Sequence, residues 1–430
     1  MFRKVISIFG VCLLLAVVAL GCGGNEQADR MDTKVGVSAV VALADSHISS
    51  YSNVLEALTM TQEVQSGDWE EMVGLLAKVE QDQVLNTIWF ALLDGSFYTV
   101  DLGKTDQNLS NRTYFPGLMA GNNVLGDLVV GKTSGLKSLI AASPVIKEGE
   151  VIGGLGAGIS LDDLSNTLAE ELALPDDMAF YATTGAGQVT LHSDTSLIFE
   201  TNTNLAKNVV FETSPLTGWR FALGYNENEQ AGRMDTKAGV SAVVALADTH
   251  ISSYANVLEA LVMTQEVQSG DWEEMVGLLA KVQQAQVPSA LWFVLPDGAY
   301  YTVDLGKTNQ NLSNRTYFPG LMAGNNVLGD LVVSKSTGKK SFIVASPVIR
   351  EGEVIGGLGA SIFLDNLSNT ISEELALPDD MVFYATTEAG EVVLHSDTPL
   401  IFETSPNLAK NVVYETSSLT GWRFALGYKD

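Results

Sequence analysis

The sequence repeats itself once, over nearly its whole length and without a gap. Residues 25–227 align with residues 228–430 at a constant offset of 203, and 39 of the 203 aligned positions differ, which leaves 164 identical. A unit of this length far exceeds the period of about 20–50 residues seen in solenoid repeats, and it can bury a core of its own. We therefore predict two tandem domains of one fold, 25–227 and 228–430, joined by the short polar segment 226–232.

The first 24 residues are different in kind. Arg3-Lys4 is followed by sixteen apolar, uncharged residues, 5–20, a run too short to span a membrane comfortably and typical of a secretory signal. The small residues around Cys22 resemble a bacterial lipobox, although Ala19 stands where the lipobox usually has leucine. The resemblance implies a signal peptide over 1–21 and a lipid on Cys22 that anchors the protein outside the cytoplasm, in the periplasm or at the cell surface. An ordinary secretory signal or an uncleaved anchor is the alternative.

The composition excludes several classes of protein. Fifty-one acidic residues face 24 basic ones, giving a net charge of −27, and such a surface repels nucleic-acid phosphates. Four histidines and two cysteines are too few for a zinc-finger or disulfide scaffold. We expect no metal and no cofactor.

The apolar pattern within each repeat predicts an α+β fold. Positions 37–58 carry one apolar stripe at helical spacing, and a second helix follows over 69–79, where Asp68 and Glu71 have the spacing of a capping box. The period then changes to two residues, which indicates antiparallel strands. We predict two hairpins (88–92 with 97–101, and 138–146 with 151–160), a helix over 162–172, and four short strands near 180–183, 189–192, 209–212 and 219–223.

The order of the motifs in each repeat resembles a Cache domain, a PAS-like extracytoplasmic ligand-sensing module of chemoreceptors and sensor kinases. The resemblance is carried by Asn111–Phe115, then Ala142–Val145, then Gly153–Gly156, and finally Gly187–Asp194, all after the expected long helix. It implies a long N-terminal helix packed on an antiparallel sheet, with a smaller sheet at the C-terminal end. It also implies a small-molecule ligand, such as an amino acid, carboxylate, amine or purine, on the face of the larger sheet.

The same resemblance selects the candidate ligand-binding residues. In amino-acid-binding Cache domains an Arg-x-aromatic-aromatic run grips the ligand carboxylate, and this chain keeps that run as Arg112, Tyr114 and Phe115. An arginine fork fits a carboxylate bidentately, and aromatic neighbours exclude water. Trp89 and Tyr98 on the first hairpin could line the same pocket or belong to the core. The equivalents in the second repeat are Arg315, Tyr317, Phe318, Trp292 and Tyr301.

Two departures from the family pattern bear on the kind of ligand. The tyrosine expected shortly before the arginine is absent, and the strand aspartate that would hold a ligand ammonium is replaced by Gly158 and, in the second repeat, by Ser361. An anion grip without an ammonium partner favours a simple carboxylate over an α-amino acid. The alternative is that Arg112 pairs with Asp101 or Asp106 and braces its own loop. Lys104 and Lys132 border the region and could add positive charge or be solvated turn residues.

Several strand positions carry a larger side chain in the second repeat, and we hypothesise that its cavity is tighter, for a smaller or different ligand. Compensated drift of the core is the alternative. The enlarged positions are Ala91→Val294, Leu139→Phe342, Ala141→Val344, Gly158→Ser361, Ser160→Phe363 and Ala179→Val382.

The sequence thus predicts a lipid-anchored ligand-binding or sensing protein for small carboxylates, related to chemotaxis-type sensors. It encodes no kinase or methyl-accepting segment, so a separate membrane receptor, kinase or transporter would be its partner. A structural or protein-interaction module with the Cache shape and no pocket is the alternative. No catalytic constellation recurs in both repeats, so we do not expect an enzyme. The isolated histidines His192 and His395 are expected to cap a turn.

Overall fold

The computed structural model describes residues 30–82, 87–132, 134–175, 178–201, 208–225, 233–285, 289–404, 408–409 and 411–429. The signal segment, Cys22, residues 176–177 and the predicted boundary between the repeats lie outside these residues. Among the described residues, no helix combines the length and the apolar character needed to cross a membrane.

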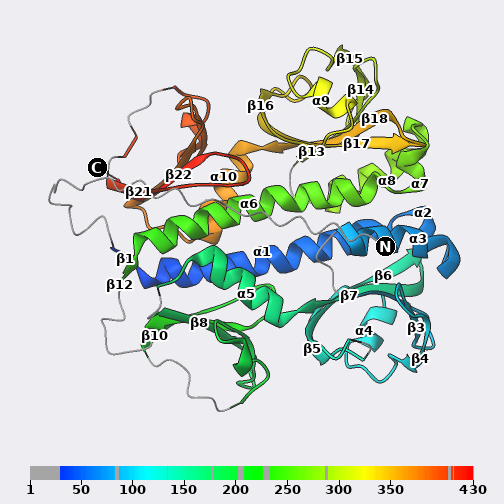
Figure 1. Ribbon diagram of the computed structural model, residues 1–430, viewed down its shortest axis with the longest axis horizontal. Helices are drawn as coiled ribbons and strands as arrows, with labels where there is room; N and C mark the ends of the chain where they lie inside the picture. The colour runs from blue at the N-terminus through cyan, green and yellow to red at the C-terminus, as the bar shows by residue number, and fades with distance from the viewer. Residues whose placement is uncertain are drawn as a thin grey trace, which may run out of the picture.

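The two repeats form two similar α+β units of the kind predicted (Figure 1). Each begins with a long helix and continues with a larger antiparallel sheet, a further helix and a smaller antiparallel sheet. The elements of the first unit are β1 (Arg30–Asp32), α1 (Thr33–Thr59), α2 (Gln62–Gln65), α3 (Trp69–Asp82), β2 (Ile88–Ala91), β3 (Ser96–Thr99), β4 (Gly103–Asn108), α4 (Phe115–Met119), β5 (Val124–Val130), β6 (Lys137–Lys147), β7 (Glu150–Ser160), α5 (Leu161–Leu172), β8 (Met178–Thr183), β9 (Val189–His192), a 3-10 turn (Thr195–Leu197), β10 (Asn208–Thr213) and β11 (Arg220–Tyr225).

The second unit repeats this order. Its elements are β12 (Arg233–Asp235), α6 (Thr236–Leu261), α7 (Gln265–Gln268), α8 (Trp272–Ala285), β13 (Ser289–Val294), β14 (Ala299–Thr302), β15 (Gly306–Asn311), α9 (Phe318–Met322), β16 (Val327–Val333), β17 (Lys340–Arg350), β18 (Glu353–Phe363), α10 (Leu364–Glu374), β19 (Met381–Thr386), β20 (Val392–His395), a 3-10 turn (Thr398–Leu400), β21 (Asn411–Thr416) and β22 (Arg423–Tyr428).

The larger sheet of the first unit has six strands in the order β4-β3-β2-β7-β6-β5, and the smaller one has four, in the order β10-β11-β8-β9. The predicted hairpins are the centre of the larger sheet: β2 pairs with β3, and β6 pairs with β7 over eleven-residue strands. The flanking strands β4 and β5 and the short helix α4 were not predicted. Strand β4, with the sequence Gly-Lys-Thr-Asp-Gln-Asn, has no apolar alternation because most of its residues are exposed.

The larger sheet has two different faces. Residues at alternate positions, such as Ile88 and Phe90, pack against the helices in the main core, because successive side chains of a strand point to opposite sides. Trp89 and Ala91 instead belong to a separate cluster on the outer face, together with Tyr114, Phe115 and Leu118 from the loop and short helix that cover it. This second, outer cluster is where the candidate ligand-binding residues lie.

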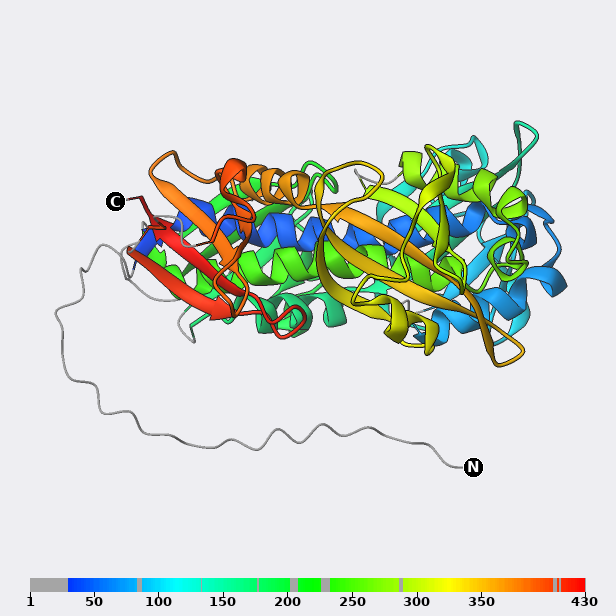
Figure 2. The same cartoon turned by 90° about the horizontal axis from the view of Figure 1, so that it is seen from above.

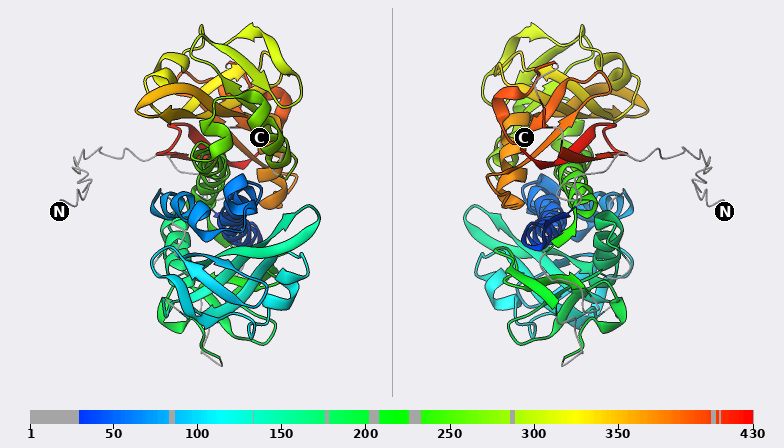
Figure 3. Two further views of the ribbon diagram at one scale, coloured as in Figure 1. Left: turned by 90° about the vertical axis from the view of Figure 1, so that its right-hand side faces the viewer. Right: turned by 90° about the vertical axis from the view of Figure 1, so that its left-hand side faces the viewer.

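The long helices join the two units. Helices α1 and α6 lie side by side along the molecule, with the sheets of one unit on one side and those of the other on the opposite side (Figures 1, 2 and 3). Residues around the whole circumference of α1 are buried, because one side packs on its own sheets and the other on α6. One continuous core therefore contains side chains of both repeats, and the units share a core in addition to having their own sheets.

Two further contacts fix the pairing at both ends of the long helices. Strand β1 pairs with β12 in an antiparallel ribbon, in which Met31 lies opposite Met234. At the other end Glu63 Oε1 accepts the backbone N–H of Gln265 at 2.8 Å, and Glu266 Oε1 accepts that of Gln62 at 2.8 Å. Each unit thus caps a short helix of the other with a buried carboxylate.

Candidate ligand-binding site

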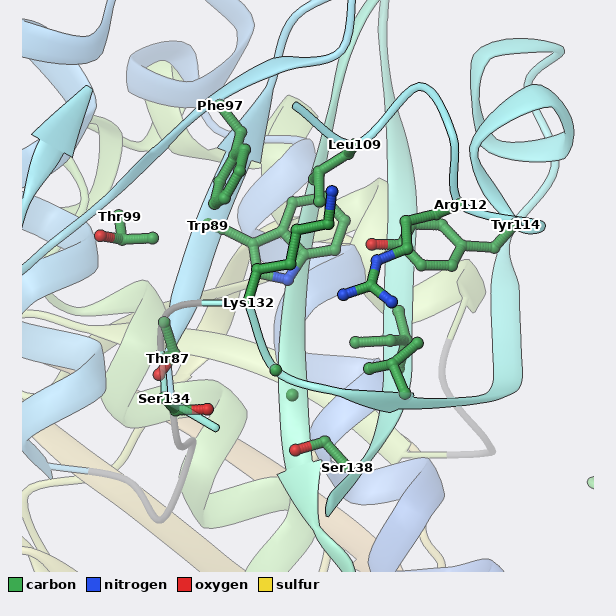
Figure 4. Close-up of a pocket in the computed structure, with 14 residues that line it drawn as sticks. Thr87, Trp89, Phe97, Thr99, Leu109, Arg112, Tyr114, Lys132, Ser134 and Ser138 are labelled. Carbon is green, nitrogen blue, oxygen red and sulfur yellow. The ribbon is translucent and has the colours of Figure 1, made fainter. Parts of the chain in front are cut away.

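A pocket opens on the outer face of the larger sheet in the first unit (Figure 4). It encloses about 510 Å³ of space, its open mouth included. Strands β2, β3, β6 and β7 form its floor, and the loops after β4 and β5 form its rim. The residues that line it are Thr87, Trp89, Phe97, Thr99, Leu109, Arg112, Tyr114, Val129, Gly131, Lys132, Ser134, Ser138, Ile140 and Gly158.

Arg112 is placed by the turn that follows β4. Asn108 Oδ1 accepts the Ser110 N–H at 2.8 Å, and the Leu109 N–H donates to the Gly95 carbonyl at 2.7 Å, so the chain turns back over the sheet. The guanidinium then donates from Nη2 to the Val130 carbonyl at 3.0 Å, while its Nε is buried and has no partner within the described part of the chain. Among the described residues Arg112 forms no ion pair, with Asp101, Asp106 or any other acid. The loop brace therefore uses one donor and leaves the guanidinium without an ion-pair partner among the described residues.

A second cation lies beside this guanidinium. Lys132 Nζ donates to the Asn108 carbonyl at 2.6 Å and to Asn111 Oδ1 at 3.1 Å, which holds the ammonium across the rim. Burial, with a further contribution from the positive charge of Arg112, lowers the pKa of Lys132. Lys132 is thus a pocket residue, as one of the two sequence interpretations proposed, whereas Lys104 is an exposed residue of β4 outside the lining.

Two aromatic side chains wall the pocket. The ring centroids of Trp89 and Tyr114 lie 6.1 Å apart, with 30° between the ring planes. Figure 4 shows both side chains, together with that of Arg112, among the residues that line the pocket. Burial raises the pKa of Tyr114 to about 12, so its hydroxyl remains a neutral donor at physiological pH. Gly156 lets the indole lie across β7, since a Cβ at that position would come within 2.2 Å of Trp89 Cζ2.

The lining contains cations and hydroxyl groups but, among the described residues, no acidic side chain. The hydroxyls come from Thr87, Thr99, Ser134 and Ser138, and the remaining walls are apolar. The pocket can therefore pair an anion with an arginine fork whose Nε is buried. It offers no carboxylate to a ligand ammonium.

The other predicted site residues lie elsewhere. Tyr98 points to the opposite face of the sheet, where its ring stacks on Trp69 at 5.2 Å, and Tyr301 stacks on Trp272 in the same way at 5.1 Å. Phe115 and Phe318 begin α4 and α9 and pack into the outer clusters without lining the pockets. The structure does not bring Tyr98 or Tyr301 to the pocket, because the two-residue period of the strand turns them away from Phe97 and Tyr300.

The second unit has the same arrangement with less space. Arg315 donates to the Val333 carbonyl at 2.8 Å and has a buried, unpartnered Nε within the described part of the chain. Lys335 bridges the Asn311 carbonyl and Asn314 Oδ1, and Trp292 lies 6.0 Å from Tyr317. The cavity encloses about 280 Å³. The unequal cavities agree with the hypothesis of a tighter second site.

The substitutions responsible are mostly not those expected from the sequence. Of the six enlarged positions only Gly158→Ser361 lines both cavities. Phe342 and Val344 face the helices, and Val382 belongs to the smaller sheet. Sequence reasoning missed Phe97→Tyr300 and Gly131→Ser334, which do line the cavities. Phe97 and Tyr300 lie on the floor strands β3 and β14, whereas Gly131 and Ser334 lie on the rim, which depends on the folding of the loops after β5 and β16.

The histidines and acids form no metal site among the described residues. His192 and His395 each accept a backbone N–H two residues on, from Asp194 and Asp397 at 2.7 Å, which is the turn cap that the sequence predicts.

The sequence matches no protein-family model and no curated protein. Similar solved structures include the ligand-binding domain of the Pseudomonas aeruginosa amino acid chemoreceptor PctB in complex with L-Gln (14% identity, 46% of this chain and 91% of that one, TM-score 0.39). Two others are the ligand-binding domain of the Pseudomonas fluorescens chemoreceptor CtaA in complex with L-serine (14%, 45% and 95%, TM-score 0.36) and the V. cholerae histidine kinase DctB sensor domain (13%, 42% and 90%, TM-score 0.34). The solved structures similar to this chain are thus Cache-type ligand-binding domains of chemoreceptors and sensor kinases, each covering about half of the chain, the length of one unit.

Proposed function

We propose that this protein binds a small carboxylate in the pocket of its first unit, outside the cytoplasm, as a sensing or capturing component. The observation that carries the proposal is the charge of the pocket. A guanidinium with a buried, unpartnered Nε lies beside a second cation, and no described acid neutralises either inside the lining. A buried donor without an acceptor is costly, and an anionic ligand that brings its own acceptors removes that cost.

The lining also favours a carboxylate without an amine. The aromatic and aliphatic walls accept a short carbon skeleton, and the hydroxyls can bond a hydroxyl or keto oxygen on it. An α-amino acid would bury an ammonium with no anionic partner, which is unfavourable. Short hydroxy and oxo acids and short unsubstituted carboxylates are therefore the ligand class that fits.

The test is a thermal-shift screen on the full two-repeat chain, because the two units share a core. The sodium salts of acetate, propionate, lactate, pyruvate and succinate would be compared with glycine, L-serine and L-glutamine. A ligand at 100 times its dissociation constant stabilises by about 2.7 kcal/mol, an easily measured rise in melting temperature. We expect a shift with carboxylates, its loss in Arg112→Ala, partial retention in Arg112→Lys, and no change in Lys104→Ala, an exposed cation outside the pocket.

A shift with the amino acids alone would contradict the ligand class. A well-folded chain that responds to none of these compounds would favour the interaction module, the second candidate function.

We further propose that Cys22 carries a lipid that holds the protein at the membrane, where a separate receptor, kinase or transporter reads the bound state. The support is the lipobox-like sequence around Cys22. Cys22→Ser should move the protein from the membrane fraction to the soluble fraction and abolish incorporation of labelled fatty acid. Retention of the label in that variant would exclude Cys22 as its site.

A further inference from the structure

The two pockets share one frame, and three of the positions that line both of them differ. Arg112, Lys132, Trp89 and Tyr114 have identical equivalents with equivalent hydrogen bonds or ring contacts. The differing positions are Phe97/Tyr300, Gly131/Ser334 and Gly158/Ser361. At each of these three positions the second unit carries the larger and more polar residue, whereas Thr87, which lines the first pocket alone, is replaced by the smaller Ala290.

Ser361 accepts the indole N–H of Trp292, a donor that a ligand in the second pocket would otherwise reach. The Trp292 indole N–H donates to Ser361 Oγ at 3.2 Å in a buried contact. At the equivalent place in the first unit Gly158 has no side chain, and no hydrogen bond of the Trp89 indole is found within the described residues. The first pocket therefore offers an indole donor to its contents, whereas the second satisfies that donor with its own serine.

Tyr300 and Ser334 reduce the second cavity further. Tyr300 is 3% exposed and lines the second cavity together with Tyr317. Ser334 Oγ accepts the Thr337 N–H at 3.2 Å and lies 3.2 Å from Ser336 Oγ, so its side chain is fixed on the rim. The space within the pocket, its open mouth included, falls from about 510 to about 280 Å³.

We propose that the chain binds one ligand per molecule, in the first unit, and that Tyr300, Ser334 and Ser361 close the equivalent site of the second unit by supplying the volume and the polar partner that a ligand would provide. This inference rests on the proposed function. The second unit then serves as a permanent, ligand-free partner across α1 and α6.

The experiment exchanges the specificity-determining residues between the units. Gly158→Ser with Phe97→Tyr closes the first pocket, and Ser361→Gly with Tyr300→Phe opens the second. A Cβ at 158 meets Ser138 only at ordinary contact distances of 3.4–3.5 Å, so the serine fits. Gly131 is left unchanged, because a Cβ there would come within 2.3 Å of Ser134 Oγ. The circular dichroism spectrum and the melting temperature of each variant show whether it still folds.

Stoichiometry is measured by equilibrium dialysis with each of the five carboxylate salts named above. We expect one site in the unmodified chain, at least tenfold weaker binding in the closed-pocket variant, two sites in the opened variant, and one site, now in the second unit, when all four substitutions are combined. Two equivalent sites in the unmodified chain, or undiminished binding after Gly158→Ser with Phe97→Tyr, would overturn the inference.

A second probe, bromide, tests the number of sites independently of whether the ligand is a carboxylate. Crystals of the unmodified chain soaked in sodium bromide should show anomalous density for bromide beside Arg112 and none beside Arg315. Bromide at Arg112 alone, with no carboxylate bound, would support the one-site inference and reject the carboxylate. Bromide at both arginines, or at Arg315 alone, would overturn the inference. Bromide at neither would overturn both proposals.

Discussion

The two repeats differ more in the space of their outer pockets than in the packing of the long helices between the units. The helices keep their pattern of burial and their reciprocal carboxylate caps. The pockets keep both cations and both main aromatics, yet one has about half the space of the other. The comparison shows that substitutions at a few positions of a pocket wall can nearly halve the space in the pocket while the framework around it stays the same.

The reason lies in what each region can tolerate. A side chain that enters the helix interface must fit neighbours from both repeats, and overpacking a core costs about 1–3 kcal/mol. A side chain that enters an open pocket displaces only water or ligand. A larger side chain at the helix interface therefore lowers the stability of the fold, whereas a larger side chain in the pocket alters binding alone.

The largest predicted difference between the units concerns the two arginines. Arg112→Ala should weaken carboxylate binding at least about thirtyfold, because truncating one member of a buried charged pair costs about 2–5 kcal/mol. Arg315→Ala should leave binding unchanged. Equilibrium dialysis of both variants makes the comparison, and equal losses would mean that the two pockets are equivalent.

A second prediction concerns pH and expects the units to behave alike. Burial raises the pKa of Asp45 and of Asp248 to about 6, although each accepts a hydrogen bond, from Ser214 and Ser417 respectively. The folded chain therefore keeps these protons up to about pH 6, whereas the unfolded carboxyl releases them near 3.8. Since the folded state binds more protons in this window, stability should fall as pH rises from about 4 to 6, by at most about 3 kcal/mol per residue.

Urea unfolding at several pH values measures this effect. Asp45→Asn and Asp248→Asn should each remove an equal part of the fall, and the double variant should remove both. If one variant flattened the curve and the other left it unchanged, the helix interface would be as asymmetric as the pockets.

A third prediction tests the shared framework of the pockets. Gly156→Ala and Gly359→Ala should each destabilise the chain by about 1–3 kcal/mol, because the new Cβ would come within 2.2 Å of the facing Trp89 or Trp292 ring. Gly74→Ala is the matched control, since nothing lies within 4 Å of that Cβ on the exposed side of α3. Alanine there should stabilise by about 0.5–1 kcal/mol. Unequal effects at 156 and 359 in denaturant unfolding would show that the two tryptophans pack differently.

The smallest predicted effect isolates the indole donor. Trp89→Phe should weaken binding about fivefold, which is the value of one hydrogen bond of about 1 kcal/mol. Trp292→Phe should leave ligand affinity unchanged, because its indole bonds to Ser361. A loss of affinity in the Trp292 variant, measured by the same dialysis, would indicate that the second pocket contributes to binding.

Much of the fold could be predicted from local pattern. The spacing of apolar residues located α1 and the central hairpins, because those elements have one buried face and a regular period. Strands β4 and β5 escaped prediction since one is polar and exposed, and the other contains Gly126 and a register shift between Leu125 and Asp127 that interrupt the alternation. For Tyr98 the sequence left the pocket and the core open, and the structure places it on the core face, where its ring stacks on Trp69.

The sequence by itself determined that the protein is one fold written twice, because an exact offset of 203 over 203 positions allows no other organisation. It also determined that an arginine and two aromatics lie close together, because they are neighbours in the chain. Only the tertiary structure decided that Lys132 lies beside Arg112, that Ser361 bonds to Trp292, and that the units pair through α1 and α6. Those contacts join residues 20 to more than 200 positions apart, and strand register and helix packing select them, which no local period encodes.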